Sequence, residues 1–139
     1  MENRNAEYPQ EIMDLINNRK YQGRITHSSS SSYIKGPCGD AMEFHLVIEE
    51  ARIIEIKYLT DGCWASNACA TMTAKLAEGK TLKEALSISA GEIIKNLNSL
   101  PEGHLHCAIL SVSTLYKAIA DYLLNKNKTR NETFVSLGR

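Results

Sequence analysis

The sequence predicts an α+β fold, in which helices cover a small three-stranded antiparallel sheet and the last helix is long. Two patterns carry this prediction. Between residues 41 and 60, apolar side chains recur at every second position, as they do in half-buried strands. From residue 64 onward they recur at every third or fourth position, as they do in amphipathic helices. At 139 residues, the chain has the length of one compact domain.

The N-terminal part of the chain predicts a helix, an edge strand and a loop. Ile12 and Ile16 stand at helical spacing, and Gly23 ends this segment. Residues 24–26 are expected to form an edge strand of the sheet. The stretch HSSSSSYIKGPCGD, residues 27–40, cannot bury much apolar surface and therefore predicts a mobile loop.

The central part of the chain predicts a β-hairpin. Its first strand has apolar residues at every second position, at Met42, Phe44, Leu46 and Ile48. Its second strand repeats the pattern at Ile54, Ile56 and Tyr58. The sequence EEAR between them can reverse the chain, so we expect the two strands to pair in antiparallel fashion.

Helices follow the hairpin. The first of them has an apolar face formed by Ala65, Cys69, Met72 and Leu76, and ends at Gly79. Thr81 and Glu84 are spaced as in a capping box, which predicts the start of the next helix. A further short helix is stopped by Pro101.

The last helix is predicted to be the longest. Its apolar stripe consists of Leu105, Ala108, Val112, Leu115, Ile119 and Tyr122. The residues after it are polar and mildly basic. We therefore expect residues 1–125 to form a single domain and residues 126–139 to be a frayed tail.

The composition argues against several classes of function. The 16 basic residues balance the 16 acidic ones, and aromatic residues make up only 6%, so nucleic acid is not an expected partner. No apolar run approaches the roughly 20 residues of a membrane span, and the polar N-terminus has no signal region. We therefore expect a cytoplasmic protein without a membrane partner, whose thiols stay reduced.

The four cysteines divide into two kinds. Cys38 lies in a Gly-Pro loop, Cys63 lies between a strand and a helix, and Cys107 lies in the first turn of the last helix. At such boundaries a side chain can point away from the core, and a helix N-terminus also stabilises a thiolate. Cys69 lies on the apolar face of its helix, which favours an ordinary core residue.

Polar residues accompany the three boundary cysteines. Asp40 follows Cys38 by two residues, and His106 directly precedes Cys107. Three thiols, a carboxylate and an imidazole are the donors that a zinc or iron–sulfur site requires, and both remain open.

The other histidines are less easily placed. His104 lies two positions from His106, so both rings are not expected to face one point easily. For His104 the sequence leaves three roles possible: it could support the metal ligands, contact a partner protein, or simply be exposed to solvent. His27 and His45 are expected at the surface. Trp64 is expected to be a partly exposed lid or partner anchor, or else a core residue.

An enzymatic function is one competing hypothesis. Cys107 with His106, or Cys63 with a distant histidine, could form a nucleophile–base pair in a hydrolase or thiol transferase. Adjacent helical residues point about 100° apart, however, which makes His106 a poor base for Cys107. No glycine-rich oxyanion loop adjoins either thiol, so we expect a carrier and not an enzyme.

Three segments resemble a known family. The stretches GPCGDAM, DGCWASNACATMTAKLAEGKTLKEA and LHCAILSVSTLYKAIADYL resemble the U-type iron–sulfur cluster scaffolds, IscU and the N-terminal domain of NifU. The likeness runs from about Glu11 to Leu124. It implies a scaffold that takes sulfur from a cysteine desulfurase, assembles a labile [2Fe–2S] cluster and passes it to acceptor proteins.

The resemblance also implies the ligands. By position they are Cys38, Asp40, Cys63, His106 and Cys107, with Cys107 as the possible persulfide acceptor. In the absence of iron the same residues could hold Zn²⁺. The alternative reading is a zinc-binding sulfur acceptor, or a structural zinc domain, of the same fold.

The chain departs from the family in one peptide. Here LPEGH stands where the best-studied IscU branch has Leu-Pro-Pro-Val-Lys, so His104 replaces a lysine. Binding to the dedicated Hsp70-type chaperone, which reads that peptide, is therefore in doubt. The zinc-bearing SufU branch has an insertion between the second and third cysteines. The interval from Cys63 to Cys107 lacks this insertion, which favours the scaffold interpretation.

Overall fold

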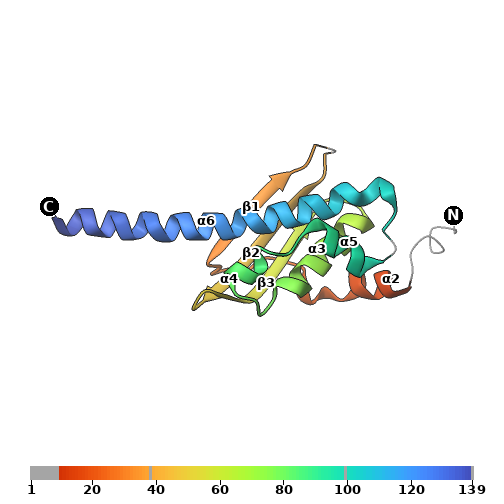
Figure 1. The fold of residues 1–139 in the computed structure, drawn as a ribbon, viewed down its shortest axis with the longest axis horizontal. Helices are drawn as coiled ribbons and strands as arrows, with labels where there is room; N and C mark the ends of the chain where they lie inside the picture. Colours follow the sequence, from red (N-terminus) through yellow and green to blue (C-terminus); the bar gives the residue numbers. More distant parts are fainter. Residues whose placement is uncertain (1–9, 38, 99, 139) are drawn as a thin grey trace.

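The computed structural model describes residues 10–37, 39–98 and 100–138, with side chains up to residue 125. Its elements are, in order, α2 (Gln10–Asn17), η1 (Arg19–Tyr21), β1 (Ser30–Lys35), β2 (Ala41–Glu49), β3 (Arg52–Thr60), α3 (Trp64–Ala77), α4 (Leu82–Ala85), α5 (Ala90–Leu97), η2 (Glu102–His104) and α6 (Leu105–Gly138). The strands form one antiparallel sheet in the order β1-β2-β3. Helix α6 lies across β1 and β2, and α3 packs beside it against β3 (Figure 1). The predicted α+β fold, with three antiparallel strands and a long C-terminal helix, is confirmed.

The serine run forms a strand, which corrects the predicted loop. The edge strand β1 is Ser30–Lys35, whereas the chain near residues 24–26 forms no strand and is preceded by an isolated bridge from Gln22 to Tyr58. Ser30 and Ser32 are buried, and their hydroxyls each donate a hydrogen bond of 2.7 Å to a main-chain carbonyl of α6. The sequence could not signal this strand, because its inward side chains are polar and are satisfied by a helix far along the chain.

The hairpin of β2 and β3 forms as predicted, with one shift. Glu50 and Ala51 make the turn with φ of 52° and 61°, the left-handed conformations of a tight two-residue hairpin. A bulge opposite Val47 and Ile48 then shifts the inward face of β3 by one residue. Ile53 is consequently buried and Ile54 is exposed, although the alternation predicted Ile54 on the apolar face.

The helices follow the predicted patterns closely. Cys69 is fully buried in α3, as expected of a core residue. Burial raises the pKa of its thiol, and the neighbouring thiols of Cys107 and Cys63 raise it further. The capping box of Thr81 and Glu84 is present at the start of α4. The stripe of α6 is buried at Ala108, Val112, Leu115 and Ile119.

Helix α6 extends further than the sequence indicated. Its helical backbone continues through residues 126–138, the segment expected to be a frayed tail, and it projects beyond the sheet (Figure 1). The domain boundary at residue 125 remains a prediction. The stretch Glu102–Asn125 has 24 residues, and its most apolar 18 residues have a mean hydropathy of 1.3, so by length and composition it could cross a membrane, contrary to our expectation. Half of those 18 residues, however, are buried within the protein. Such burial is also typical of the core helix of a globular protein.

Candidate metal centre

Polar and thiol side chains converge at one end of the sheet. There β1 ends opposite the start of β2, and the start of β2 lies opposite the end of β3. Asp40 therefore lies beside the turn that carries Cys63, which is the N-cap of α3. The short helix η2 brings His104 to the same place, and the first turn of α6 brings Cys107.

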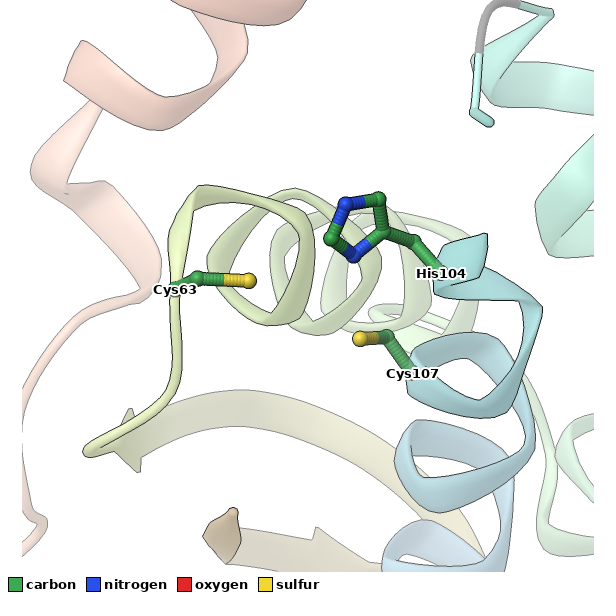
Figure 2. Close-up of side chains that lie close together, drawn as sticks. All are labelled: Cys63, His104 and Cys107. Carbon is green, nitrogen blue, oxygen red and sulfur yellow. The ribbon is translucent and has the colours of Figure 1, made fainter. Parts of the chain in front are cut away.

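One group of donors consists of Cys63, His104 and Cys107. One ligand atom from each lies within 4.8 Å of the others. Figure 2 shows the three side chains, from three different segments, pointing toward a common space. Cys63 is exposed, His104 is half-buried and Cys107 is fully buried, so the group lies at the surface with its inner side closed.

A second group consists of Asp40, His106 and Cys107. Their ligand atoms also lie within 4.8 Å of one another, and His106 Nε2 is 3.6 Å from Cys107 Sγ. The argument from helical direction, which held His106 away from Cys107, is therefore wrong. At the first turn of α6, the exposed His106 ring can fold back toward the adjacent thiol.

The two imidazoles belong to different groups of donors that have Cys107 in common. His104 precedes Cys107 by three residues and therefore lies on the same side of the helical turn. His106 reaches the same thiol from the neighbouring position. The three-residue spacing between His104 and Cys107 could have predicted that they lie on the same side of a helix. This prediction requires knowing that helical structure already begins at η2, before His104.

Ser66 is a site residue that the sequence did not indicate. Its hydroxyl oxygen lies 3.0 Å from Asp40 Oδ2 and 3.4 Å from Cys107 Sγ, and it is fully buried. The space it occupies depends on Gly62, because a Cβ there would lie 2.4 Å from Ser66 Oγ and 3.0 Å from Asp40 Oδ2. Ser66 thus joins the carboxylate of one group to the thiol shared by both.

Main-chain bonds fix the loop that carries Asp40. Gly36 N–H donates to the Asp40 carbonyl at 2.7 Å, and Gly39 adopts a φ of 99°, which glycine tolerates best. Asp61 accepts a bond of 2.8 Å from Ala41 N–H, which ties this loop to the turn before α3. Cys38 lies outside the described residues, so its predicted place in the site and the predicted mobility of its loop remain predictions.

The surroundings hold His104 in place. Cys63 is the N-cap residue of α3, and Cys107 lies in the first turn of α6, directly after η2. The half-buried Trp64 ring lies 5.4 Å from the His104 ring, centre to centre, at a tilt of 60°. Trp64 therefore contacts a site residue, whereas the sequence left open whether it was a lid or core residue.

The remaining histidines lie outside both groups of donors. His27 is exposed, as expected. His45 is buried, contrary to expectation, because its Nε2 lies 2.5 Å from a Glu43 carboxylate oxygen on the same strand. Arg24 also pairs with Glu43. The hydrogen bond from Arg24, helped by the bond to His45, holds the pKa of Glu43 at about 2.

This chain is similar in sequence to two iron–sulfur cluster assembly scaffold proteins. IscU 1 of Archaeoglobus fulgidus, an iron–sulfur cluster assembly scaffold protein, is 33% identical over 122 residues, which cover 87% of this chain and 80% of that protein. The IscU scaffold protein of Aquifex aeolicus is 30% identical over 125 residues, with coverage of 88% and 80%.

The chain is also similar to part of a longer protein and to a solved structure. The nitrogen fixation protein NifU of Nostoc sp. is 28% identical over 84% of this chain, which spans only 42% of NifU. The crystal structure of FiSufU from Fervidobacterium islandicum matches with a TM-score of 0.70 and 23% identity, over 82% of this chain and 97% of that one. This likeness supports the fold alone.

The family match covers nearly all of the chain. The family model of the NifU-like N terminal domain matches residues 7–129, which include every donor described above. With this match and relatives that are 30 to 33% identical over most of both chains, the chain belongs to the family of NifU-like N-terminal domains.

Proposed function

We propose that this protein is a scaffold on which a labile [2Fe–2S] cluster is assembled and from which it is passed to acceptor proteins. The observation that carries the proposal is the meeting of soft and hard donors at one surface opening, with Cys107 common to both groups. The similarity to the IscU scaffold proteins of Archaeoglobus fulgidus and Aquifex aeolicus supports the scaffold role. The cluster is cargo on this view, and the protein acts as a carrier and not as an enzyme.

The mixture of donors suits temporary binding. Thiolates hold iron tightly, so a protein that stores a cluster uses four of them. We propose Cys38, Cys63 and Cys107 as the thiolate ligands, with Asp40 and His106 as alternative fourth ligands. A carboxylate or imidazole is exchanged more readily than a thiolate, so this corner is the one from which the cluster can be released.

Sulfur would come from a cysteine desulfurase. The Cys107 thiolate attacks the outer sulfur of the desulfurase persulfide, so that one S–S bond forms and another breaks, and the desulfurase thiolate leaves. Turning that sulfur into sulfide takes two electrons, which an external reductant supplies. We propose Cys107 as the acceptor because it lies at a helix N-terminus and is common to both groups of donors.

A zinc-binding sulfur acceptor is the second candidate. Two thiols and an imidazole within 4.8 Å of one another also suit Zn²⁺, which binds sulfur and nitrogen in tetrahedral sites. Colour separates the two functions, because an iron–sulfur cluster absorbs visible light and zinc does not.

Anaerobic reconstitution with iron, cysteine and a desulfurase tests the scaffold proposal. The wild-type chain should gain visible absorption that is lost when an apo-acceptor is added. Cys38→Ser, Cys63→Ser and Cys107→Ser should each prevent a stable chromophore, because each removes one of only three soft ligands.

Cys69→Ser is the matched control for these variants. It should keep the chromophore and lower the free energy of unfolding by about 1–3 kcal/mol, because it places a hydroxyl in the core. A wild-type protein that stays colourless while binding zinc would refute the scaffold function. Loss of the chromophore in Cys69→Ser alone would refute the assignment of ligands.

A further inference from the structure

We propose that His104 is itself a metal ligand, and that Cys63, His104 and Cys107 form a site for a single Fe²⁺ ion. The family resemblance assigns His106 to the cluster, and it has a lysine at position 104. The site would hold the first iron before sulfur arrives, and this purpose rests on the proposed scaffold function. The binding of a metal ion by these three residues does not depend on that function.

The geometry of the three donors fits a tetrahedral ion. With metal–sulfur bonds of about 2.3 Å and metal–nitrogen bonds of about 2.1 Å, ligand atoms in a tetrahedral site lie roughly 3.5–3.8 Å apart. The three donor atoms already lie within 4.8 Å of one another, so a shift of about 1 Å would close them around an ion. Figure 2 shows that the shift requires no reversal of any side chain. The fourth position would stay open for water or sulfur.

Contacts within the chain hold His104 in this orientation. Its main-chain N–H donates to the Pro101 carbonyl at 2.9 Å, which closes η2, and its ring lies against Trp64. Three residues later, Cys107 lies on the same side of the turn. A ring held by packing loses little freedom on binding, which favours ligation.

The proposed site is separate from the second group of donors. The rings of His104 and His106 are 6.4 Å apart, centre to centre, and the two groups have only Cys107 in common. An ion held through His104 therefore leaves Asp40 and His106 available for a second iron. A lysine must lose a proton before it can bind a metal, whereas a neutral imidazole need not, so His104 is the better metal ligand of the two at neutral pH.

Titration of the full chain with Co²⁺ under anaerobic conditions tests the inference. Co²⁺ replaces Fe²⁺ and Zn²⁺ in such sites, and its absorption reports both tetrahedral geometry and bonds to thiolate. His104→Ala and His104→Lys should weaken Co²⁺ binding at least about tenfold, since even residues outside the ligand shell change metal affinity by that factor. His27→Ala is the matched control, since His27 is exposed and lies outside both groups of donors, and it should change the affinity less than about threefold.

The outcomes distinguish this inference from the scaffold proposal. Unchanged Co²⁺ affinity in both His104 variants, a larger loss in His106→Ala, or no tetrahedral spectrum in the wild type would overturn the inference. Circular dichroism of the metal-free variants checks that each is folded, and His104→Lys keeps the family residue for that purpose. If reconstitution yields no cluster while Co²⁺ binding still depends on His104, the scaffold proposal fails and the site stands.

Discussion

A single hydroxyl group links Asp40 to Cys107, the thiol that both groups of donors contain. Ser66 has one hydrogen to donate, yet its oxygen lies within hydrogen-bond distance of both Asp40 Oδ2 and Cys107 Sγ. It can therefore donate to only one of them at a time. When a metal ion takes the Cys107 sulfur, the hydrogen remains for Asp40. The positions of these two donors are thus coupled through a residue that need not touch the metal.

Gly62 is expected to be indispensable to this arrangement. In Gly62→Ala the new methyl would meet Ser66 Oγ at 2.4 Å, so the turn before α3 must move. We expect a loss of about 1–3 kcal/mol in the free energy of unfolding of the metal-free protein, as for other overpacked positions. Denaturant unfolding measures it.

Gly103→Ala is the matched control, since a Cβ at that position meets nothing within 4 Å. It should leave the free energy of unfolding unchanged or slightly higher. Equal values for the two alanine variants would show that the contact at Gly62 relaxes without cost.

At the scale of elements, the packing of β1 on α6 depends on polar contacts. Ser30→Ala and Ser32→Ala should each lower the free energy of unfolding by about 1 kcal/mol, because each removes a buried hydrogen bond to a carbonyl of α6. Ser31→Ala is the control on the same strand, where the side chain is exposed, and it should change the value little. Urea unfolding curves of the three variants decide the point. Equal losses at all three positions would mean that strand propensity, and not the bonds to α6, is responsible.

The pairing of Glu43 predicts a dependence of stability on pH. The pKa of Glu43 is held at about 2, below its ordinary value of 4.5, so the carboxylate stabilises the folded protein above pH 4.5 and this contribution is lost as pH falls toward 2. Glu43→Gln should therefore cost about 1 kcal/mol at pH 6, because Arg24 is largely exposed and solvent screens the pair. The difference from wild type should shrink by pH 3.

Unfolding in urea at pH 6 and at pH 3 measures this effect. Asp121→Asn is the control, since its exposed pairing with Lys117 is within one helix turn and should contribute little at either pH. A difference between Glu43→Gln and wild type that grows toward low pH would contradict the prediction.

Elements whose buried face is apolar could be predicted from the sequence, and the others could not. The period of α3 and α6 and the alternation of β2 follow directly from which side chains avoid water. The strand β1 has no such pattern, because its inward serines are satisfied by carbonyls of α6. His45 is also buried although it is polar: its Nε2 is bonded to Glu43, and its Nδ1 has no hydrogen-bond partner among the described residues. The bulge in β3 depends on pairing across strands and leaves no mark on its own sequence.

At the scale of the whole molecule, the sheet separates the candidate centre from the hairpin turn. The strands β2 and β3 have nine residues each, so their two ends lie roughly 30 Å apart. Asp40 and Cys63 adjoin one end, and Glu50 and Ala51 turn the chain at the other. Changes at the turn should therefore leave metal binding unaffected.

Replacement of Glu50-Ala51 by Asn-Gly is expected to stabilise the protein. Both residues adopt positive φ, which costs an ordinary residue about 1–2 kcal/mol and which Asn-Gly adopts readily. We expect the free energy of unfolding to rise by about 1 kcal/mol, with unchanged Co²⁺ affinity. Thermal unfolding and the Co²⁺ titration measure the two quantities. A lowered metal affinity would show that the turn and the centre are coupled across the sheet.

The candidate centre was predicted less completely than the fold. Cys63 and Cys107 could be predicted as site residues because they lie at the boundaries of predicted elements. Asp40 and His106 could be predicted because they lie close to the cysteines Cys38 and Cys107 in the sequence. The contribution of His104 depends on how η2 joins α6, and the contribution of Ser66 depends on how α3 packs against α6. Both contributions depend on how helices pack together, so they cannot be predicted from a local pattern of residues.

The unequal exposure of the two thiols has a consequence for timing. Cys107 is closed off by the core, whereas Cys63 and His106 face solvent. If the protein is the scaffold proposed above, a cluster held between them would have one open side, through which an acceptor, dioxygen and water would all approach. Delivery and decay would then be competing processes that begin together, and the fraction delivered would depend on the ratio of their rates. A more enclosed site would lengthen the lifetime of the cluster and slow its delivery.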